Sequence, residues 1–135
     1  MAIAIVPDTN AVSVLFKLSA VHQPTLDALR SELSGRIAFV SFVTVAELLF
    51  WAEEKGWGQK RRDEMDERLR GFGILEPTRE TAEIWASTKA TAKASGNRLS
   101  AHDLWIAAAC LEHDLPLISN DGAFDAIPRI SRRSI

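Results

Sequence analysis

The sequence is poor in cysteine, in long apolar runs and in net charge. Cys110 is its only cysteine, which excludes an internal disulfide and gives no indication of an oxidising compartment. The apolar neighbours of Cys110 predict a small buried side chain rather than a reactive thiol. The apolar run at positions 1–6 is too short for a signal or membrane segment and has no basic flank. We therefore expect a cytoplasmic protein.

An overall basic field, which nucleic-acid-binding domains commonly have, is also missing. The 135 residues include 16 Lys and Arg and 18 Asp and Glu, which gives a formal charge of −2. This balance counts mildly against a nucleic-acid partner. The conclusion changes if a metal ion neutralises some acids, because setting four of them aside leaves 14 against 16 basic residues. Net charge alone therefore does not decide the class of partner.

Linkers, internal repeats and low-complexity tracts are absent, and the length suits a single domain over residues 1–135. Hydrophobic residues make up 47% of the chain, which argues against disorder. Segments with strand-like apolar runs alternate with segments of helical apolar spacing. This alternation predicts an α/β three-layer domain with a central parallel sheet of four to five strands flanked by helices. We expect strands at 2–6, 37–41, 73–76, 116–119 and 129–130, and helices at 23–33, 44–55, 59–70, 79–94 and 100–113.

The first predicted strand ends next to an acid. Its apolar run, typical of a strand buried on both faces, reaches Val6, and Pro7 stops it one residue before Asp8. Ligands bind outside the carboxyl ends of parallel strands. Asp8 therefore lies where this architecture performs its chemistry.

Topology brings three further acids to the same edge of the sheet. The helix after the second strand begins at this edge, and we expect Glu47 in its first turn. The helix before the fourth strand also begins there, with Asp103 in its first turn, and Asp121 closely follows that strand. Each acid also has a structural explanation as a helix cap or a turn residue. None of these explanations requires all four to share one edge.

Converging carboxylates repel one another, by roughly 3 kcal/mol for two charges about 5 Å apart at an effective dielectric of about 20. A cluster of four takes up protons or binds a cation. Oxygen ligands without cysteine or a histidine cage suit Mg²⁺ or Mn²⁺. Such an ion activates water and stabilises charge on a phosphate, so the pattern predicts a metal-dependent phosphodiesterase.

Four segments carry a family resemblance. They are Asp8-Thr9-Asn10, Glu47-Leu48, Asp103 to Ala108, and Ser119-Asn120-Asp121. In this order they resemble the PIN domain and, more narrowly, the VapC ribonuclease toxins of VapBC toxin–antitoxin pairs. The resemblance spans nearly the whole chain. It implies a PIN-like fold, cleavage of single-stranded RNA with Mg²⁺ or Mn²⁺, a cognate antitoxin and a homodimer.

The resemblance also implies roles for individual residues. Asp8, Glu47, Asp103 and Asp121 match the catalytic, metal-binding acids of the family. Two further residues, Asn10 and Ser119, match polar positions that orient those acids. Two residues depart from the common pattern: Pro7 replaces an aliphatic residue, and His102 directly precedes an acid. Neither removes a ligand, and we expect His102 to face solvent.

Basic residues near the C-terminus are candidate RNA contacts. Arg129, Arg132 and Arg133 have few acids nearby in the sequence, so their charge is available for phosphates. The basic run at 60–62 shares its helix with four acids, which favours an ion-paired, solvated face.

Apolar residues on the Glu47 helix extend beyond one face. We expect an inward stripe of Val45, Leu48, Leu49 and Ala52. Phe50, Trp51 and Trp57 lie beyond this stripe and belong either to the core or to a protein interface, whereas Trp85 and Trp105 are expected in the core.

Three other functions fit parts of the pattern. A PIN nuclease of RNA processing without a toxin role shares every motif. A PIN-like binding module without catalysis is disfavoured because all four acids are present. A receiver-like phosphoacceptor domain needs a late lysine to hold the phosphoryl group, and positions 115–135 contain none.

Overall fold

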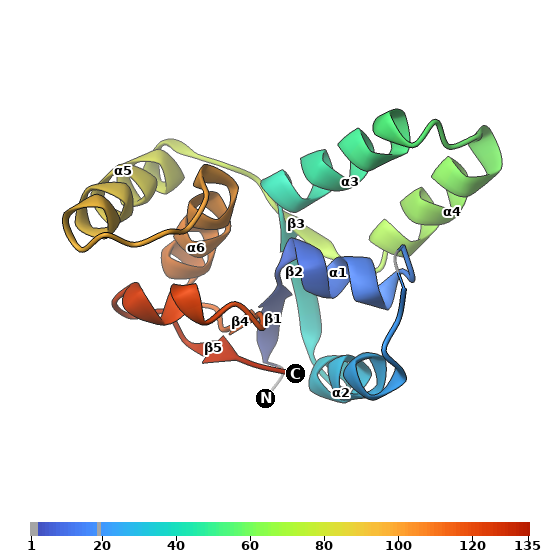
Figure 1. Ribbon diagram of the computed structural model, residues 1–135, viewed down its shortest axis with the longest axis horizontal. Coiled ribbons are helices and arrows are strands. Elements are labelled where there is room, and N and C mark those ends of the chain that lie inside the picture. Colours follow the sequence, from blue (N-terminus) through green and yellow to red (C-terminus); the bar gives the residue numbers. More distant parts are fainter. Residues whose placement is uncertain (1–2, 19) are drawn as a thin grey trace.

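The computed structural model describes residues 3–18 and 20–135, and in this part the strands form one five-stranded sheet (Figure 1). All neighbouring strands pair in parallel, in the order β3-β2-β1-β4-β5. The predicted α/β fold is therefore confirmed, although the predicted first strand began at Ala2, which lies outside the described residues. The strands are β1 (Ala4–Pro7), β2 (Ile37–Ser41), β3 (Gly73–Leu75), β4 (Leu117–Ile118) and β5 (Arg132–Arg133).

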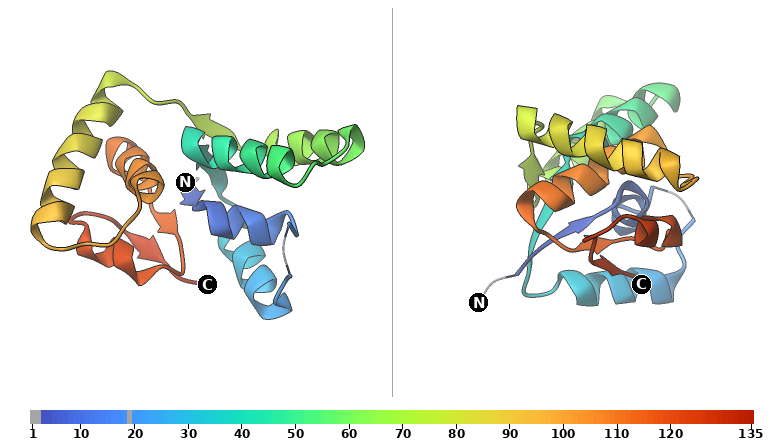
Figure 2. Two further views of the ribbon diagram at one scale, coloured as in Figure 1. Left: turned by 45° about the horizontal axis from the view of Figure 1, so that its top comes forward. Right: turned by 90° about the vertical axis from the view of Figure 1, so that its left-hand side faces the viewer.

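Helices cover both faces of this sheet (Figures 1 and 2). Side chains alternate across the pleat of a strand, so Ile5 packs with α1 and α2 while Val6 packs with α5 and α6. Of the helices that the structure describes, none is long and apolar enough to cross a bilayer. The helices are α1 (Thr9–Leu15), α2 (Gln23–Leu33), α3 (Phe42–Glu54), α4 (Gln59–Leu69), α5 (Arg79–Ala94), α6 (Ala101–His113) and the 3₁₀ helix η1 (Gly122–Ala126).

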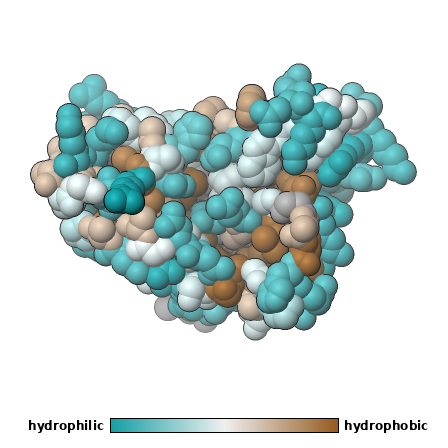
Figure 3. All heavy atoms as spheres, viewed as in Figure 1, coloured by the Kyte–Doolittle hydropathy of each residue, from teal (hydrophilic) through white to brown (hydrophobic). Residues whose placement is uncertain are grey.

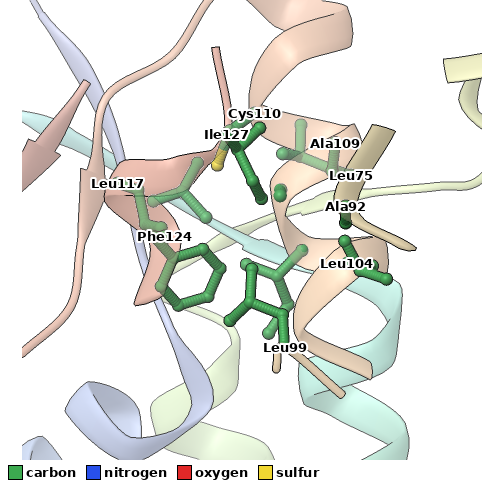
Figure 4. Close-up of a cluster of buried hydrophobic side chains, with 12 residues drawn as sticks. Leu75, Ala92, Leu99, Leu104, Ala109, Cys110, Leu117, Phe124 and Ile127 are labelled. Carbon is green, nitrogen blue, oxygen red and sulfur yellow. The ribbon is translucent and has the colours of Figure 1, made fainter. Parts of the chain in front are cut away.

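The face below α5 and α6 holds a large buried cluster (Figure 4). Cys110 is 1% exposed within it, as predicted, and burial raises the pKa of its thiol to about 12. Phe124 of η1 is fully buried in the same cluster, so this core anchors the short helix that follows β4. The labelled members in Figure 4 are Leu75, Ala92, Leu99, Leu104, Ala109, Cys110, Leu117, Phe124 and Ile127.

On the other face, α3 and α4 form an arm that projects from the sheet (Figures 1 and 2). Leu48 and Ala52 are fully buried against α4, as predicted, and Trp57 is 7% exposed in the same core. The predicted inward position of Leu49 is wrong, because this side chain is 46% exposed; Phe50 is 57% exposed beside it. The apolar stripe of α3 is therefore narrower than the sequence predicts.

Tryptophans were predicted less well than aliphatic residues. Trp51 is half-buried against the α3–α4 core. Trp85 and Trp105 are half-buried rather than fully in the core, and their rings stack with centroids 4.9 Å apart. An indole is large enough to cover a core with one face and meet solvent with its edge, which explains these intermediate positions.

Two predicted boundaries are wrong in ways that affect the site. Ser41 caps α3 by accepting a hydrogen bond from the Val43 amide, so Glu47 lies in the second turn rather than the first. The helix-cap explanation that the sequence allowed for Glu47 therefore does not apply. The predicted edge strand at 129–130 is displaced to Arg132–Arg133, because Arg129 follows a proline and has a φ of 69°, outside the strand region.

A close approach explains one glycine. Gly73 begins β3 opposite Phe39 of β2, and a Cβ at position 73 would lie 2.4 Å from two atoms of the Phe39 ring. Only glycine lets this edge strand pair with β2 without displacing the ring.

Candidate active site

Asp8 lies at the carboxyl end of β1, at the centre of the sheet. Its amide donates to the Ile118 carbonyl at 2.9 Å, which joins it to the end of β4. Its Oδ1 accepts a hydrogen bond from the Ala11 amide at 2.8 Å, so Asp8 also caps α1. The residue is only 5% exposed. Asp8 therefore has the capping role that the sequence allowed. Capping uses one carboxylate oxygen, and the other oxygen remains available as a ligand.

Ser119 connects Asp8 with the turn that follows β4. It is fully buried, and its side chain beside Asp8 holds down the pKa of that carboxyl. Its Oγ also accepts a hydrogen bond from the Asp121 amide at 3.0 Å. Asp121 in turn caps η1 by accepting from the Ala123 amide at 2.9 Å. Ser119 is thus adjacent to two of the acids, and its role in orienting them stays a prediction.

Glu47 is positioned by a residue that the sequence analysis did not single out. The Thr9 hydroxyl donates to Glu47 Oε1 at 2.9 Å and lies 3.0 Å from the Thr44 hydroxyl. Thr9 is 6% exposed and directly follows Asp8. One turn of the chain therefore contains Asp8 and also fixes the position of Glu47. The Asp-Thr-Asn motif indicates only that a threonine buried there needs a hydrogen-bond partner, and it does not say which residue that partner is.

Asp103 enters the site from the first turn of α6, as predicted. Its amide donates to the hydroxyl of the N-cap residue Ser100 at 3.1 Å. The neighbouring His102 is exposed, as expected, and its Nδ1 lies 3.9 Å from Glu47 Oε2. This contact shows that the second turn of α3 and the first turn of α6 lie side by side at the edge.

Three of the acids lie near enough to one another for their charges to interact. Burial raises the pKa of Asp8, and the charges of Asp103 and Asp121 raise it further. Burial also raises the pKa of Asp103, with a further contribution from Asp121. Each of these carboxylates is therefore repelled by at least one other carboxylate. The deprotonated cluster is destabilised in the absence of a positive charge.

A hydrated divalent cation fits this set of oxygen donors. Within the described residues, no three His, Cys, Asp or Glu side chains lie close enough to form a ready-made cage. Mg²⁺ commonly keeps several waters and uses only one or two carboxylates, so a complete protein cage is not required. The raised pKa values of Asp8 and Asp103 are the expected mark of carboxylates that a cation would stabilise.

The remaining predicted residues lie outside this cluster. Asn10 is exposed in α1, and among the described contacts its side chain makes no hydrogen bond. Arg132 is bound to Asp125 and to the Ser119 carbonyl, while Arg133 lies 3.4 Å from Glu32 on α2. The roles of Asn10 in orienting the acids and of the three arginines in RNA binding stay predictions.

Comparisons with known proteins agree with this arrangement. A family model described as PIN domain matches residues 5–130, whereas a comparison with curated proteins gives no match. Among solved structures, FitAcB from Neisseria gonorrhoeae is 28% identical with a TM-score of 0.77, over 95% of this chain and 95% of that chain. VapBC-5 from Mycobacterium tuberculosis, a member of the VapBC family of toxin–antitoxin systems, is 25% identical with a TM-score of 0.67, over 98% and 97%. VapBC2 from Rickettsia felis, bound to a DNA fragment from its promoter, is 16% identical with a TM-score of 0.81, over 98% and 99%; this last likeness concerns the fold alone.

Proposed function

The chain belongs to the PIN domain family, a family of nucleases, and from this premise we propose that it is an endoribonuclease dependent on Mg²⁺ or Mn²⁺. It hydrolyses RNA phosphodiester bonds and acts as the toxin of a type II toxin–antitoxin pair. We place this activity in the cytoplasm. The observation that carries the proposal is the cluster of acids at the carboxyl edge of β1 and β4, where Asp8 and Asp103 both have raised pKa values.

The four acids would surround the ion from different sides. Asp8 and Asp103 are the buried and half-buried members and would hold it at the floor of the site. Glu47 and Asp121 would complete the acidic environment from the two sides. When bound, the ion supplies the positive charge that activates a water and stabilises charge developing on the phosphate and the leaving oxygen.

Neighbouring hydroxyl groups keep these carboxylates in place. The Thr9 hydroxyl donates to Glu47 and would restrain it, and the Ser119 hydroxyl accepts from the Asp121 amide and would restrain the turn that carries Asp121. Both hydroxyl groups belong to buried residues, so neither restraint competes strongly with bulk water. Outer residues of this kind typically change metal affinity or activity by about 10- to 100-fold when they are removed.

The toxin assignment draws on the neighbouring structures. The Mycobacterium tuberculosis neighbour is a member of the VapBC family of toxin–antitoxin systems, and the match covers 98% of this chain and 97% of that chain. We therefore propose a cognate antitoxin that covers the acidic edge and keeps RNA from it.

An exposed apolar face on α3 supports the proposed homodimer. Phe42, Leu49 and Phe50 are 47%, 46% and 57% exposed, and their spacing of seven and eight residues places them on one side of the helix. Contiguous exposed apolar side chains of this kind mark protein interfaces. Sedimentation should therefore show a dimer that Leu49→Asp converts to a monomer; a wild-type monomer would refute this part of the proposal.

Cleavage of single-stranded RNA tests the enzymatic proposal. Wild-type protein should cleave with Mg²⁺ or Mn²⁺ and lose activity in excess EDTA, and Asp103→Asn should be inactive. Asp66→Asn on α4 is a matched control, because it makes the same chemical change on an exposed acid far from the edge and should cleave normally. Cleavage in EDTA, or by Asp103→Asn, would refute the proposal.

Induced expression distinguishes the toxin from a nuclease of RNA processing. A toxin should arrest growth when it is induced alone, and Asp103→Asn should not. Mapping the RNA ends after induction would then identify the cut sites. Normal growth with active enzyme present would favour the RNA-processing role.

A further inference from the structure

Arg132 binds both ends of the segment that carries Asp121. Its Nη1 donates to the Ser119 carbonyl at 3.0 Å, on the strand side of the segment. Its Nε and Nη2 donate to the two carboxylate oxygens of Asp125 at 2.8 and 2.7 Å, on the η1 side. One guanidinium therefore joins the residue two positions before Asp121 to a residue four positions after it.

Phe124 anchors this segment in the core, and the Asn97 side chain donates to the Ala123 carbonyl at 3.3 Å. The β4 strand that leads into the segment has only two residues. The backbone of Ser119 pairs with Arg133, and the Asn120 side chain accepts from the Ile135 amide at 2.7 Å. The C-terminal strand and its flanks thus supply most of the long-range hydrogen bonds that hold the Asp121 turn.

Displacement of Ser119 would change the surroundings of two acids, Asp8 and Asp121. The Ser119 hydroxyl faces Asp8, and its Oγ receives the Asp121 amide. Arg132 binds the backbone carbonyl of Ser119. Its guanidinium is therefore linked through this one residue to both Asp8 and Asp121. The Arg132 side chain is 18% exposed.

The geometry of the contact is specific to arginine. A planar guanidinium presents parallel donors to a carboxylate and a further donor to a third oxygen, whereas an ammonium group is a point charge. Lysine at position 132 would keep the positive charge near Asp121 but would lose the fork that joins Ser119 to Asp125.

We propose that Arg132 is a positioning residue of the acidic site: by joining Ser119 to Asp125, it holds the turn that carries the Asp121 carboxylate at the carboxyl edge of the sheet. The inference rests on the proposed function for the role of Asp121, and it differs from the RNA contact expected for Arg132 from the sequence. Three of the five N–H donors of Arg132 are already committed to the protein, and its charge is paired with that of Asp125, which disfavours a phosphate contact.

Amide hydrogen exchange in the metal-free protein tests the positioning directly. Arg132→Lys and Arg132→Ala should each accelerate exchange at the Asp121 and Ala123 amides by about tenfold or more, because opening of the turn exposes them. Arg133→Ala is the matched control, since it removes the same charge from the adjacent residue and breaks only the contact with Glu32 on α2. It should leave both amides unchanged.

Mn²⁺ titration and kinetics provide two further readouts. Arg132→Lys should weaken Mn²⁺ binding about tenfold and lower kcat for RNA cleavage with KM nearly unchanged. If Arg132→Ala does not fold, Asp125→Asn breaks the same fork from the other side and should reproduce the exchange and Mn²⁺ results.

Three outcomes would overturn the inference. Unchanged exchange in the Arg132 variants would show that the fork does not hold the turn. Wild-type behaviour of Arg132→Lys would show that charge alone matters, and a raised KM with unchanged exchange would restore the RNA contact. Absence of Mn²⁺ binding by the wild-type protein would instead refute the proposed function, and with it the metal half of the inference.

Discussion

Two regions of this molecule are dense in acids and compensate them in opposite ways. On the arm formed by α3 and α4, the acids lie beside arginines: Arg62 lies 2.9 Å from Glu53, and Arg70 lies 2.6 Å from Glu67. The outer end of this arm is strongly hydrophilic in Figure 3. Its charges are solvated and paired, as the mixed sequence of α4 predicts.

At the carboxyl edge of the sheet the acids have little compensation. Among the described ion-pair contacts, the one that involves any of the four carboxylates joins His102 Nδ1 to Glu47 Oε2 at 3.9 Å. Repulsion and burial raise the pKa values of Asp8 and Asp103. Among the described contacts, the fold pairs two acids of the arm with arginines and gives the acids of the edge no such pair, which suggests that the edge is retained for function rather than for stability.

The largest expected difference between the two regions is in catalysis. Asp8→Asn should lower the rate of RNA cleavage by roughly two to three orders of magnitude, the scale on which one electrostatic stabiliser of a transition state acts. Asp66→Asn on the arm should leave the rate within about twofold of wild type. Single-turnover cleavage with saturating Mn²⁺ measures both, and equal rates for the two variants would abolish the distinction.

Metal binding should stabilise the protein only through the edge. At a Mn²⁺ concentration of about 100 times Kd, the free energy of unfolding should rise by about 2.7 kcal/mol, because the ion binds the folded state alone. Urea unfolding with and without Mn²⁺ measures this increment. Asp103→Asn should lose it and Asp66→Asn should keep it; a full increment in Asp103→Asn would place the ion elsewhere.

On the arm, removing an arginine should affect stability alone. Arg62 donates to the Trp57 and Ala52 carbonyls at 2.8 and 3.1 Å, in addition to its contact with Glu53. Arg62→Ala should therefore cost about 1–2 kcal/mol in urea unfolding. Glu53→Gln keeps both carbonyl contacts and should cost less than about 0.5 kcal/mol, because its carboxylate is well exposed. Loss of Mn²⁺ binding in Arg62→Ala would show that the arm and the edge are coupled.

The smallest expected effect is a gain in stability at the edge. Burial raises the pKa of Asp8 above 3.8 in the folded protein, so the folded state holds this proton more tightly than the unfolded state does. The resulting stabilisation is complete below pH 3.8 and is lost as pH rises through the folded-state pKa. Asp8→Asn avoids that loss and can still accept from the Ala11 amide.

Thermal unfolding in EDTA measures this gain. At neutral pH the Tm of Asp8→Asn should exceed that of wild type by about 2 °C, the scale of somewhat less than 1 kcal/mol in a domain of this size. The difference should shrink as the pH falls toward 4. A lower Tm for Asp8→Asn at neutral pH would show that the ionised carboxylate stabilises the fold.

The placement of the acids was predictable from topology. Asp8 directly follows a strand, Asp121 lies three residues beyond one, and Asp103 lies three residues from a helix cap, so the parallel arrangement alone brings them to one edge. Glu47 was placed at the right edge but in the wrong turn. Ser41 and Thr44 are both good N-cap residues, and only the pairing of β2 with its neighbours decides where the helix begins.

The contacts around the acids depend on packing and were not predictable. Thr9 meets Glu47 because α1 and α3 pack against each other with one particular rotation, which neither helix specifies alone. Arg132 meets Asp125 across a turn whose preceding strand has two residues, too few for any periodic signal. The exposed side chain of Leu49 likewise depends on how narrowly α4 covers α3.

Calorimetric titration of the metal-free protein with Mn²⁺, together with Asp8→Asn and Asp66→Asn, tests the central claim most directly. The edge should bind Mn²⁺ in the wild-type protein and in Asp66→Asn with the same affinity, and Asp8→Asn should show no binding. Equal binding by all three proteins would place the ion away from the acidic edge, and no binding by the wild-type protein would contradict a metal site altogether.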